Sequence, residues 1–173
     1  MILKDVVING PSGSGKDSFV ELVHVVADYN VINISSVDPL RSIPKQWGWN
    51  GEKDLNYRKA LIALKEAATY IDNYPLRYML EKRQRIKESS IKAVIFYHIR
   101  EPHNIEEFIE AIDDDVKVLL IRRFPMDEQT PDYNQVNEYK HYDYVITNVT
   151  DDYESLRTSA ITFAKQWGPL RAQ

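Results

Sequence analysis

A glycine-rich segment near the start of the chain constrains the fold more than any other feature. It reads INGPSGSGKDSF over residues 8–19, and Gly10, Gly15 and Lys16 in it have the spacing G-x-x-x-x-G-K. An apolar run precedes the segment and residues of helical period follow it. Glycines in this context let backbone N–H groups and a helix N-terminus surround an anion. The segment therefore predicts a phosphate-binding loop between a strand and a helix, with a plain turn as the alternative.

The rest of the chain continues this alternation of strand and helix. Segments of helical period lie between short apolar runs and include 16–28 and 102–112. Strands that are apolar on both faces and alternate with helices indicate a mostly parallel sheet covered by helices. We expect an α/β fold with a five-stranded parallel sheet and helices on both faces. The predicted strands are 2–8, 31–34, 92–99, 116–121 and 142–147.

Two segments interrupt the regular pattern. The stretch between the second and third strands is too long for one crossover, and two helices are predicted in it, at about 53–72 and 75–88. We interpret about 39–90 as a helical insertion that covers a ligand site in one domain of residues 1–173, whose core is 1–38 and 91–173. Residues 122–141 contain two prolines and no clean period, which predicts a mobile loop.

Composition excludes several classes of function. The 173 residues are 43% hydrophobic and 28% charged, the balance of a soluble globular protein. Without cysteine there are no disulfides and no thiolate metal sites, and the four histidines lack ligand spacing. The net charge of −4 argues against a nucleic acid polymer as partner. No secretory or membrane-spanning segment is recognisable, so we expect a cytoplasmic protein with small-molecule partners and no membrane partner, and a homodimer stays open.

The predicted loop supplies the expected contacts to a nucleotide. Lys16 is expected to reach the β- and γ-phosphates, and Ser18 to donate to the α- or β-phosphate. Asp17 stands where such loops usually place a serine or threonine that holds Mg²⁺. A carboxylate is a strong Mg²⁺ ligand and is stabilised in the first turn of a helix, although a helix-capping acid without a metal is the alternative. The predicted nucleotide-binding residues are Gly10, Ser12, Gly13, Ser14, Gly15, Lys16, Asp17 and Ser18.

The motif GPSGSGKDS resembles two groups of P-loop kinases in which G-K-D replaces G-K-[ST]. These are the bacteriophage-type deoxynucleoside monophosphate kinases and the animal-type phosphomevalonate kinases. The segments FYHIREPHNIEEF (96–108) and YDYVITN (142–148) resemble the phage-type family. The resemblance implies a P-loop kinase fold that transfers the γ-phosphoryl group of ATP to a deoxynucleoside monophosphate with Mg²⁺. The family has an aspartate where this chain has His98, which leaves Asp17 as the metal-facing acid and leaves open a contribution of Asp38 through water.

Candidates for the acceptor's phosphate follow the second and third strands. Ser36, Asp38 and Arg41 lie in SSVDPLR (35–41), at the edge where ligands bind in parallel sheets. The stretch resembles S-x-G-D-x-x-R of adenylate-kinase-like enzymes, in which the arginine grips the acceptor's phosphate by a two-pronged contact. A surface arginine is the alternative for Arg41. Arg100 follows the third strand and resembles the family's arginine, so it is the stronger candidate.

Further cations lie on the two interrupting segments. Arg122 and Arg123 open the expected mobile loop, and one of them is expected to stabilise the transferring phosphoryl group from a closing lid. Arg58 and Lys65 are seven residues apart and share a helix face, where they can bind substrate. A solvated helix face is the alternative for this pair.

Residues that can recognise a base lie in the same insertion. Tyr57 and Tyr70 are available to stack on a base, and Asn73 can hydrogen-bond a base edge or simply end a helix before Pro75. Because a monophosphate oxygen is already ionised near neutral pH, no general base is required. The resemblance to the phage-type family and the aromatic residues of the insertion favour a nucleoside monophosphate kinase. A phosphomevalonate-type kinase and a catalytically inactive nucleotide-binding module are the alternatives.

Overall fold

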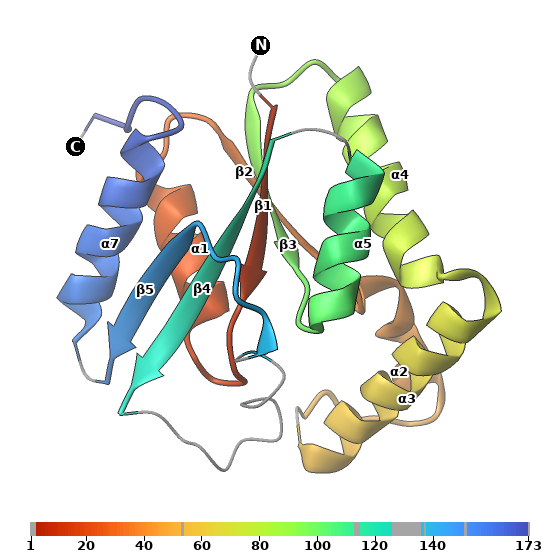
Figure 1. The fold of residues 1–173 in the computed structure, drawn as a ribbon. Coiled ribbons are helices and arrows are strands. Elements are labelled where there is room, and N and C mark those ends of the chain that lie inside the picture. The colour runs from red at the N-terminus through yellow and green to blue at the C-terminus, as the bar shows by residue number, and fades with distance from the viewer. Residues whose placement is uncertain are drawn as a thin grey trace.

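Five parallel strands form one sheet in the order β2-β3-β1-β4-β5 (Figure 1). The computed structural model describes residues 3–52, 54–112, 115–125, 136, 138–150 and 152–172. The strands are β1 (Leu3–Asn9), β2 (Asn30–Ser35), β3 (Ala93–His98), β4 (Val116–Phe124) and β5 (Tyr144–Val149). With helices on both faces of the sheet, the predicted fold class is confirmed.

Two of the helices begin at an aspartate that caps their first turn. The side chain of Asp54 accepts from the backbone N–H of Tyr57, and that of Asp152 accepts from Ser155, so each satisfies a donor of a first helical turn. Asn73 adopts a left-handed conformation with φ of 50° between α3 and α4. The helical elements are α1 (Lys16–Val26), η1 (Asp38–Leu40), α2 (Ser42–Gln46), α3 (Leu55–Asp72), α4 (Tyr74–Glu88), α5 (Pro102–Ile112) and α7 (Tyr153–Lys165).

Each face of the sheet has its own apolar core. On one face α1 and α7 pack on alternate residues of the strands, among them Val6 and Ile8 of β1. On the other face α4 and α5 pack on the residues between them, such as Val7. Successive side chains of a strand point to opposite faces, so a central strand covered on both sides is apolar at most buried positions, and a buried polar residue such as Asp5 needs a partner. This is why the predicted strands read as continuous apolar runs.

The helix α3 lies beside the sheet edge rather than against either face (Figure 1). Among its described residues only Tyr57 and Lys65 are buried. The strand arrows in Figure 1 point toward this end of the molecule, so α3 stands at the carboxyl ends of the strands. None of the helices in the described residues is long and apolar enough to cross a membrane.

A buried ion pair ties the inserted helices to the central strand. Arg83 of α4 donates to both carboxylate oxygens of Asp5 in β1 at 2.8–3.0 Å. The hydroxyl of Tyr97 in β3 also donates to Asp5, at 2.9 Å. Burial, and next the neighbouring Asp5 carboxylate, raise the pKa of Tyr97 far above its usual range, so this hydroxyl keeps its proton. The pair is satisfied by hydrogen bonds, as a buried charge requires.

The structure changes three of the sequence-based expectations. The fourth strand extends to Phe124, so Arg122 and Arg123 lie on β4 and not in a loop. The segment about 39–90 contains η1 and α2 in addition to the two helices expected there. Most of the lid expected over about 122–141 falls at 126–135 and 137, outside the described residues. The extension of β4 has a physical cause, since Arg122 and Arg123 pair with Thr147 and Asn148 of β5.

Replacing Arg83 by alanine is expected to destabilise the protein by about 3–5 kcal/mol, because the Asp5 carboxylate would stay buried without its counter-charge. Chemical denaturation followed by circular dichroism measures this difference. Arg85→Ala is the matched control, since Arg85 is an exposed residue of the same helix. Equal stability of the two variants would contradict the assignment of Arg83 as the anchor of the insertion.

Candidate functional site

The glycine-rich loop connects β1 to α1 at the carboxyl edge of the sheet. Gly10 and Gly15 have φ of 149° and 95°, which lie in the region that favours glycine. A Cβ at Gly10 would collide with the backbone carbonyl of Ile121, and one at Gly15 with the side-chain amide of Asn148. These two positions therefore require glycine both for their conformation and for their close neighbours.

Side-chain donors hold the carbonyl oxygens of this loop. The ammonium of Lys16 donates to the carbonyls of Gly10 at 2.5 Å and Pro11 at 2.7 Å. Asn148 of β5 donates to the carbonyl of Ser14 at 2.9 Å. A carbonyl oxygen that pointed into the loop would repel a phosphate, so bonds that hold these oxygens favour the cradle conformation in which N–H groups face an anion.

Arg123 completes this support from the end of β4. Its guanidinium donates to the carbonyl of Gly13 at 3.0 Å and to the hydroxyl of Thr150 at 3.2 Å. The prediction placed Arg123 at the site on a mobile lid, whereas the structure places it on a strand in contact with the loop itself. Its charge therefore stands beside the phosphate-binding loop without a lid movement.

Asn9 and Asn148 are site residues that the sequence analysis missed. The buried side chain of Asn9 accepts from the backbone N–H of Gly10 at 2.7 Å and donates to the hydroxyl of Tyr142 at 2.9 Å and the carbonyl of Arg100 at 3.2 Å. It therefore fixes the entry to the loop against the segment that follows β3. The only signal in the sequence was an asparagine at the end of an apolar strand, where a buried amide needs partners.

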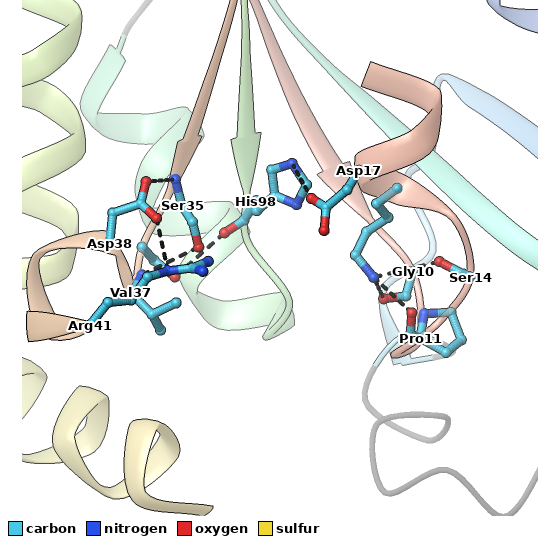
Figure 2. Close-up of polar contacts among 11 residues, drawn as sticks. Gly10, Pro11, Ser14, Asp17, Ser35, Val37, Asp38, Arg41 and His98 are labelled. Atoms are coloured by element: carbon cyan, nitrogen blue, oxygen red, sulfur yellow. Dashed lines mark hydrogen bonds and ion pairs between the residues drawn. The ribbon is translucent and has the colours of Figure 1, made fainter. Parts of the chain in front are cut away.

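His98 faces Asp17 at the centre of the edge (Figure 2). The Nε2 atom of His98 lies 3.9 Å from Oδ1 of Asp17, and 81% of the Asp17 side chain is exposed. This Nε2 atom is buried and has no hydrogen-bond partner among the described residues. Burial lowers the pKa of His98 to about 4; the Asp17 carboxylate opposes that shift, and Lys16, Arg41 and Arg100 reinforce it. The imidazole is therefore neutral at pH 7.

Asp38 and Arg41 form a second polar group on the other side of His98 (Figure 2). Asp38 accepts from the backbone N–H of Ser35 at 2.7 Å, and its other oxygen lies 3.1 Å from Nε of Arg41. Ser36 is buried and donates through its hydroxyl to the carbonyl of His98 at 3.4 Å. Asp38 thus orients Arg41 and closes the turn after β2.

Two cations of α3 contact residues at the carboxyl edge of the sheet, and their spacing of seven residues predicts that they share one face of the helix. Arg58 donates to the hydroxyl of Ser12 in the loop at 2.7 Å. Lys65 is only 8% exposed and pairs with the carboxylate of Glu101. Burial alone would raise the pKa of Glu101, but Lys65 lowers it below its ordinary value. Lys65 is therefore held by a protein carboxylate at the position where the sequence suggested a substrate contact.

The expected stacking residues of α3 are placed elsewhere. The ring of Tyr57 is buried and stacks on Trp49 with centroids 3.8 Å apart and planes 1° apart. Tyr70 is 93% exposed on the outer side of the helix. The expectation that Tyr57 stacks on a base is wrong in this structure, because another aromatic ring already covers it.

A small pocket lies between the inserted helices and α5. Its lining combines apolar side chains with amide, carboxylate, ammonium and hydroxyl groups. Asn73 donates to Glu107 at 3.2 Å, and Asn104 donates to Glu101 at 3.2 Å. The pocket is lined by Ser36, Lys65, Thr69, Asn73, Pro75, Leu76, Met79, Ile99, Asn104 and Glu107.

The pocket unites predicted and unpredicted residues. Ser36, Lys65 and Asn73 were candidates for substrate binding, and all three line it. Asn104 and Glu107 were missed. Their signal was a spacing of three residues on α5, which places both on one face of the first turns after β3.

The remaining predicted residues lie along the same edge. Arg100 directly follows β3, and its carbonyl is bonded to Asn9. Ser18 is exposed in the first turn of α1, and Arg122 is exposed near the end of β4. No group of three or more histidine, cysteine, aspartate or glutamate residues that could hold a metal occurs among the described residues. A cation here would therefore have Asp17 as its carboxylate ligand and depend on a bound nucleotide for further oxygens.

Comparisons with known proteins give only weak similarities. No family model matches the chain, and no curated protein matches it. Similar solved structures include an unliganded sugar kinase from Janibacter sp. HTCC2649, with 14% identity over 96% of this chain and 94% of that chain and a TM-score of 0.49. A second is a Cys556Ala mutant of the Mycobacterium tuberculosis APS kinase CysC, with 16% identity, coverage of 94% and 95%, and a TM-score of 0.44.

A gluconokinase from Sinorhizobium meliloti 1021 is also similar, with 11% identity, coverage of 94% of each chain and a TM-score of 0.41. Because every TM-score is below 0.5 and every identity is 16% or less, no activity or substrate is inferred from these proteins. The fold and the site described above rest on this chain's own sheet topology and contacts.

Acidification is expected to destabilise the protein through His98. The pKa of this imidazole is about 4 when folded and 6.5 ordinarily, so the unfolded chain binds a proton that the folded one does not. The free energy of unfolding is therefore unaffected by this histidine above pH 6.5. As the pH falls from 6.5 toward 4, it decreases by on the order of 2 kcal/mol, because protonation of His98 favours the unfolded chain. Urea denaturation at pH 7 and pH 4.5 should show a smaller loss in His98→Gln than in the wild type. The exposed His24→Gln control should keep the wild-type loss, and an equal loss in all three proteins would contradict the assignment.

Removing the Asn148 amide is expected to weaken the binding of ATP. Asn148→Ala frees the carbonyl of Ser14, and one such hydrogen bond contributes about 0.5–1.5 kcal/mol, so the Kd should rise about two- to tenfold. Fluorescence titration with a labelled ATP analogue measures the change. Thr147→Ala, an exposed neighbour on the same strand, is the control. Identical affinities of the two variants would show that the amide does not support the loop.

Proposed function

We propose that the chain is an ATP-dependent kinase that phosphorylates a nucleoside or deoxynucleoside monophosphate. One observation carries the proposal: the phosphate-binding loop and the small pocket lie at the same edge of the sheet, and His98 has contacts on the side of each. The His98 side chain faces Asp17 beside the loop, while its carbonyl accepts from Ser36, which lines the pocket. A donor phosphate in the loop and an acceptor in the pocket would therefore lie on either side of this residue, as group transfer requires.

On the donor side, the loop N–H groups and Lys16 bind the β- and γ-phosphates of ATP. Lys16 now donates to Gly10 and Pro11, and a phosphate oxygen is a stronger acceptor than either carbonyl. Asp17 is exposed at the first turn of α1 and suits a Mg²⁺ ion as an oxygen ligand, directly or through water. Such an ion, when bound, neutralises charge between the β- and γ-phosphates.

On the acceptor side, Arg41 and Arg100 bind the monophosphate. Both follow strands of the sheet, β2 and β3, at the same edge as the loop, and their positive charges lower the pKa of His98. Asp38 forms an ion pair with Arg41 at its Nε atom, 3.1 Å away, without a hydrogen bond of good geometry. This leaves the two terminal amino groups of its fork for a phosphate.

The reaction that follows from this arrangement is an in-line displacement. An oxygen of the acceptor's phosphate forms a bond to the γ-phosphorus, and the bond from that phosphorus to the β,γ-bridging oxygen breaks, which leaves ADP. The attacking oxygen is already ionised, so no side chain must remove a proton. Arg123 and Arg58 touch the loop from β4 and α3, where a positive charge stabilises the transferring group.

The pocket wall favours a base over an aliphatic acceptor. Stacking on the tyrosines of the insertion is a weaker argument for a base than the sequence suggested, since Tyr57 is covered by Trp49. The amides of Asn73 and Asn104 and the carboxylate of Glu107 instead offer hydrogen-bond donors and acceptors beside apolar side chains. A heterocyclic base presents both kinds of group on a flat apolar body, whereas phosphomevalonate presents a hydroxyl and an anionic carboxylate on a short aliphatic chain.

The deciding experiment measures ADP release from ATP and Mg²⁺ with each deoxynucleoside monophosphate, its ribose counterpart and phosphomevalonate. We expect turnover with at least one nucleotide and a loss of at least a hundredfold in Lys16→Ala, since the loop lysine neutralises the transferring phosphate. Asp17→Asn should lower turnover and raise the Mg²⁺ concentration required for half-maximal rate. Lys165→Ala, at the far end of α7, is the control for loss of a surface lysine.

Two outcomes would overturn the proposal. Turnover with phosphomevalonate alone would identify the other acceptor class. Tight ATP binding without ADP release above that of Lys16→Ala, for any acceptor, would identify a nucleotide-binding module without catalysis.

A further inference from the structure

The Nε2 atom of His98 is a buried polar atom that the protein itself does not satisfy. It has no hydrogen-bond partner among the described residues and is shielded from solvent. The nearest charged oxygen, Oδ1 of Asp17, is 3.9 Å away, which is too far for a hydrogen bond. A buried nitrogen left in this way destabilises a protein by about 1–3 kcal/mol, so it marks a place where a ligand supplies the missing contact.

The surroundings of this nitrogen indicate which kind of ligand it is. A phosphate oxygen placed between His98 and Asp17 would be negatively charged, and the Asp17 carboxylate would repel it. A divalent cation in that position is attracted by the carboxylate and accepts the lone pair of a neutral imidazole. Lys16 and Arg41 lie on either side of this pair (Figure 2), so a cation would bind there together with the phosphates that neutralise these two positive charges.

We propose that His98 and Asp17 together hold the divalent cation of the nucleotide complex, through one imidazole nitrogen and one carboxylate oxygen. Mg²⁺ prefers oxygen ligands, whereas imidazole is a good ligand for first-row transition ions. The site should therefore accept Mn²⁺ or Co²⁺ better, relative to Mg²⁺, than a site built only from oxygen. This inference rests on the proposed binding of a nucleoside triphosphate at the loop.

The geometry requires only a small movement of one side chain. Bonds of about 2.0–2.2 Å place neighbouring ligand atoms of an octahedral ion about 3 Å apart, so Asp17 must approach by about 1 Å. Asp17 is free to do so because 81% of its side chain is exposed. His98 does not need to move, since its carbonyl is held by the N–H and the hydroxyl of Ser36. One fixed and one adjustable ligand allow the site to close when the nucleotide brings the ion.

The test is pulsed electron paramagnetic resonance of Mn²⁺ bound with the β,γ-methylene analogue of ATP, which has no nitrogen in its phosphate chain. A nitrogen ligand couples its nuclear spin to the Mn²⁺ electron spin, and the wild type should show this ¹⁴N coupling. The coupling should disappear in His98→Gln while Mn²⁺ and nucleotide stay bound. It should persist in His24→Gln, because His24 is an exposed residue farther along α1. Labelling the histidines with ¹⁵N should replace the ¹⁴N coupling of the wild type by a ¹⁵N coupling.

Metal preference gives a second readout from the same proteins. The ratio of the nucleotide Kd in Mg²⁺ to that in Mn²⁺ should fall severalfold in His98→Gln. His98→Asp, which replaces nitrogen by oxygen, should shift the preference further toward Mg²⁺. Calorimetric titration of the nucleotide analogue in each metal measures both ratios.

The outcomes separate this inference from the proposed function. Turnover in the wild type without ¹⁴N coupling, or coupling that survives in His98→Gln, overturns the metal assignment and leaves the kinase proposal intact. Coupling that depends on His98 but without transfer to any acceptor supports the metal site and overturns the kinase proposal. Failure of the wild type to bind Mn²⁺ and nucleotide at all overturns both.

Discussion

The ion pair between Asp5 and Arg83 determines where the helical insertion stands relative to the phosphate-binding loop. Asp5 lies in the middle of β1, and the loop begins at the end of the same strand. Arg83 therefore fixes α4, and with it the pocket, to the strand that leads into the phosphate-binding loop. A buried pair of this kind often adds little net stability, because desolvation offsets the attraction. Its value here is positional, since an apolar contact in the same place would allow α4 to slide along the sheet.

Polar contacts also attach α3, and they differ in character from that anchor. Arg58 meets Ser12 in an exposed contact, whereas Lys65 meets Glu101 in a largely buried one. With so few buried side chains, α3 gains little hydrophobic stabilisation from its position. Elements held in this way open at a low free-energy cost. The insertion is thus anchored through α4 and attached more weakly through α3.

The sequence predicts the sheet well because burial on both faces leaves a visible apolar run in the central strands β1, β3 and β4. The edge strands β2 and β5 are still rich in β-branched residues. It predicts the loop because glycine is needed at Gly10 and Gly15 for conformation and close approach. It does not predict the extension of β4, since Arg122 and Arg123 are polar and pair with β5 only through tertiary register. Asn148 and Glu107 escape prediction for the same reason, because their partners lie far away in sequence.

The cations of the edge already have acceptors within the protein. Lys16 and Arg123 hold carbonyls of the loop, and Arg41 holds Asp38. A phosphate that binds must therefore exchange these contacts rather than find unpaired charges, which lowers the affinity per contact but keeps each cation oriented. The Nε2 atom of His98 and the Nε atom of Arg41 differ, because both are buried without a hydrogen-bond partner among the described residues. At His98 Nε2, whose nearest charged oxygen among these residues is 3.9 Å away and too far for a hydrogen bond, a ligand adds an interaction without replacing one.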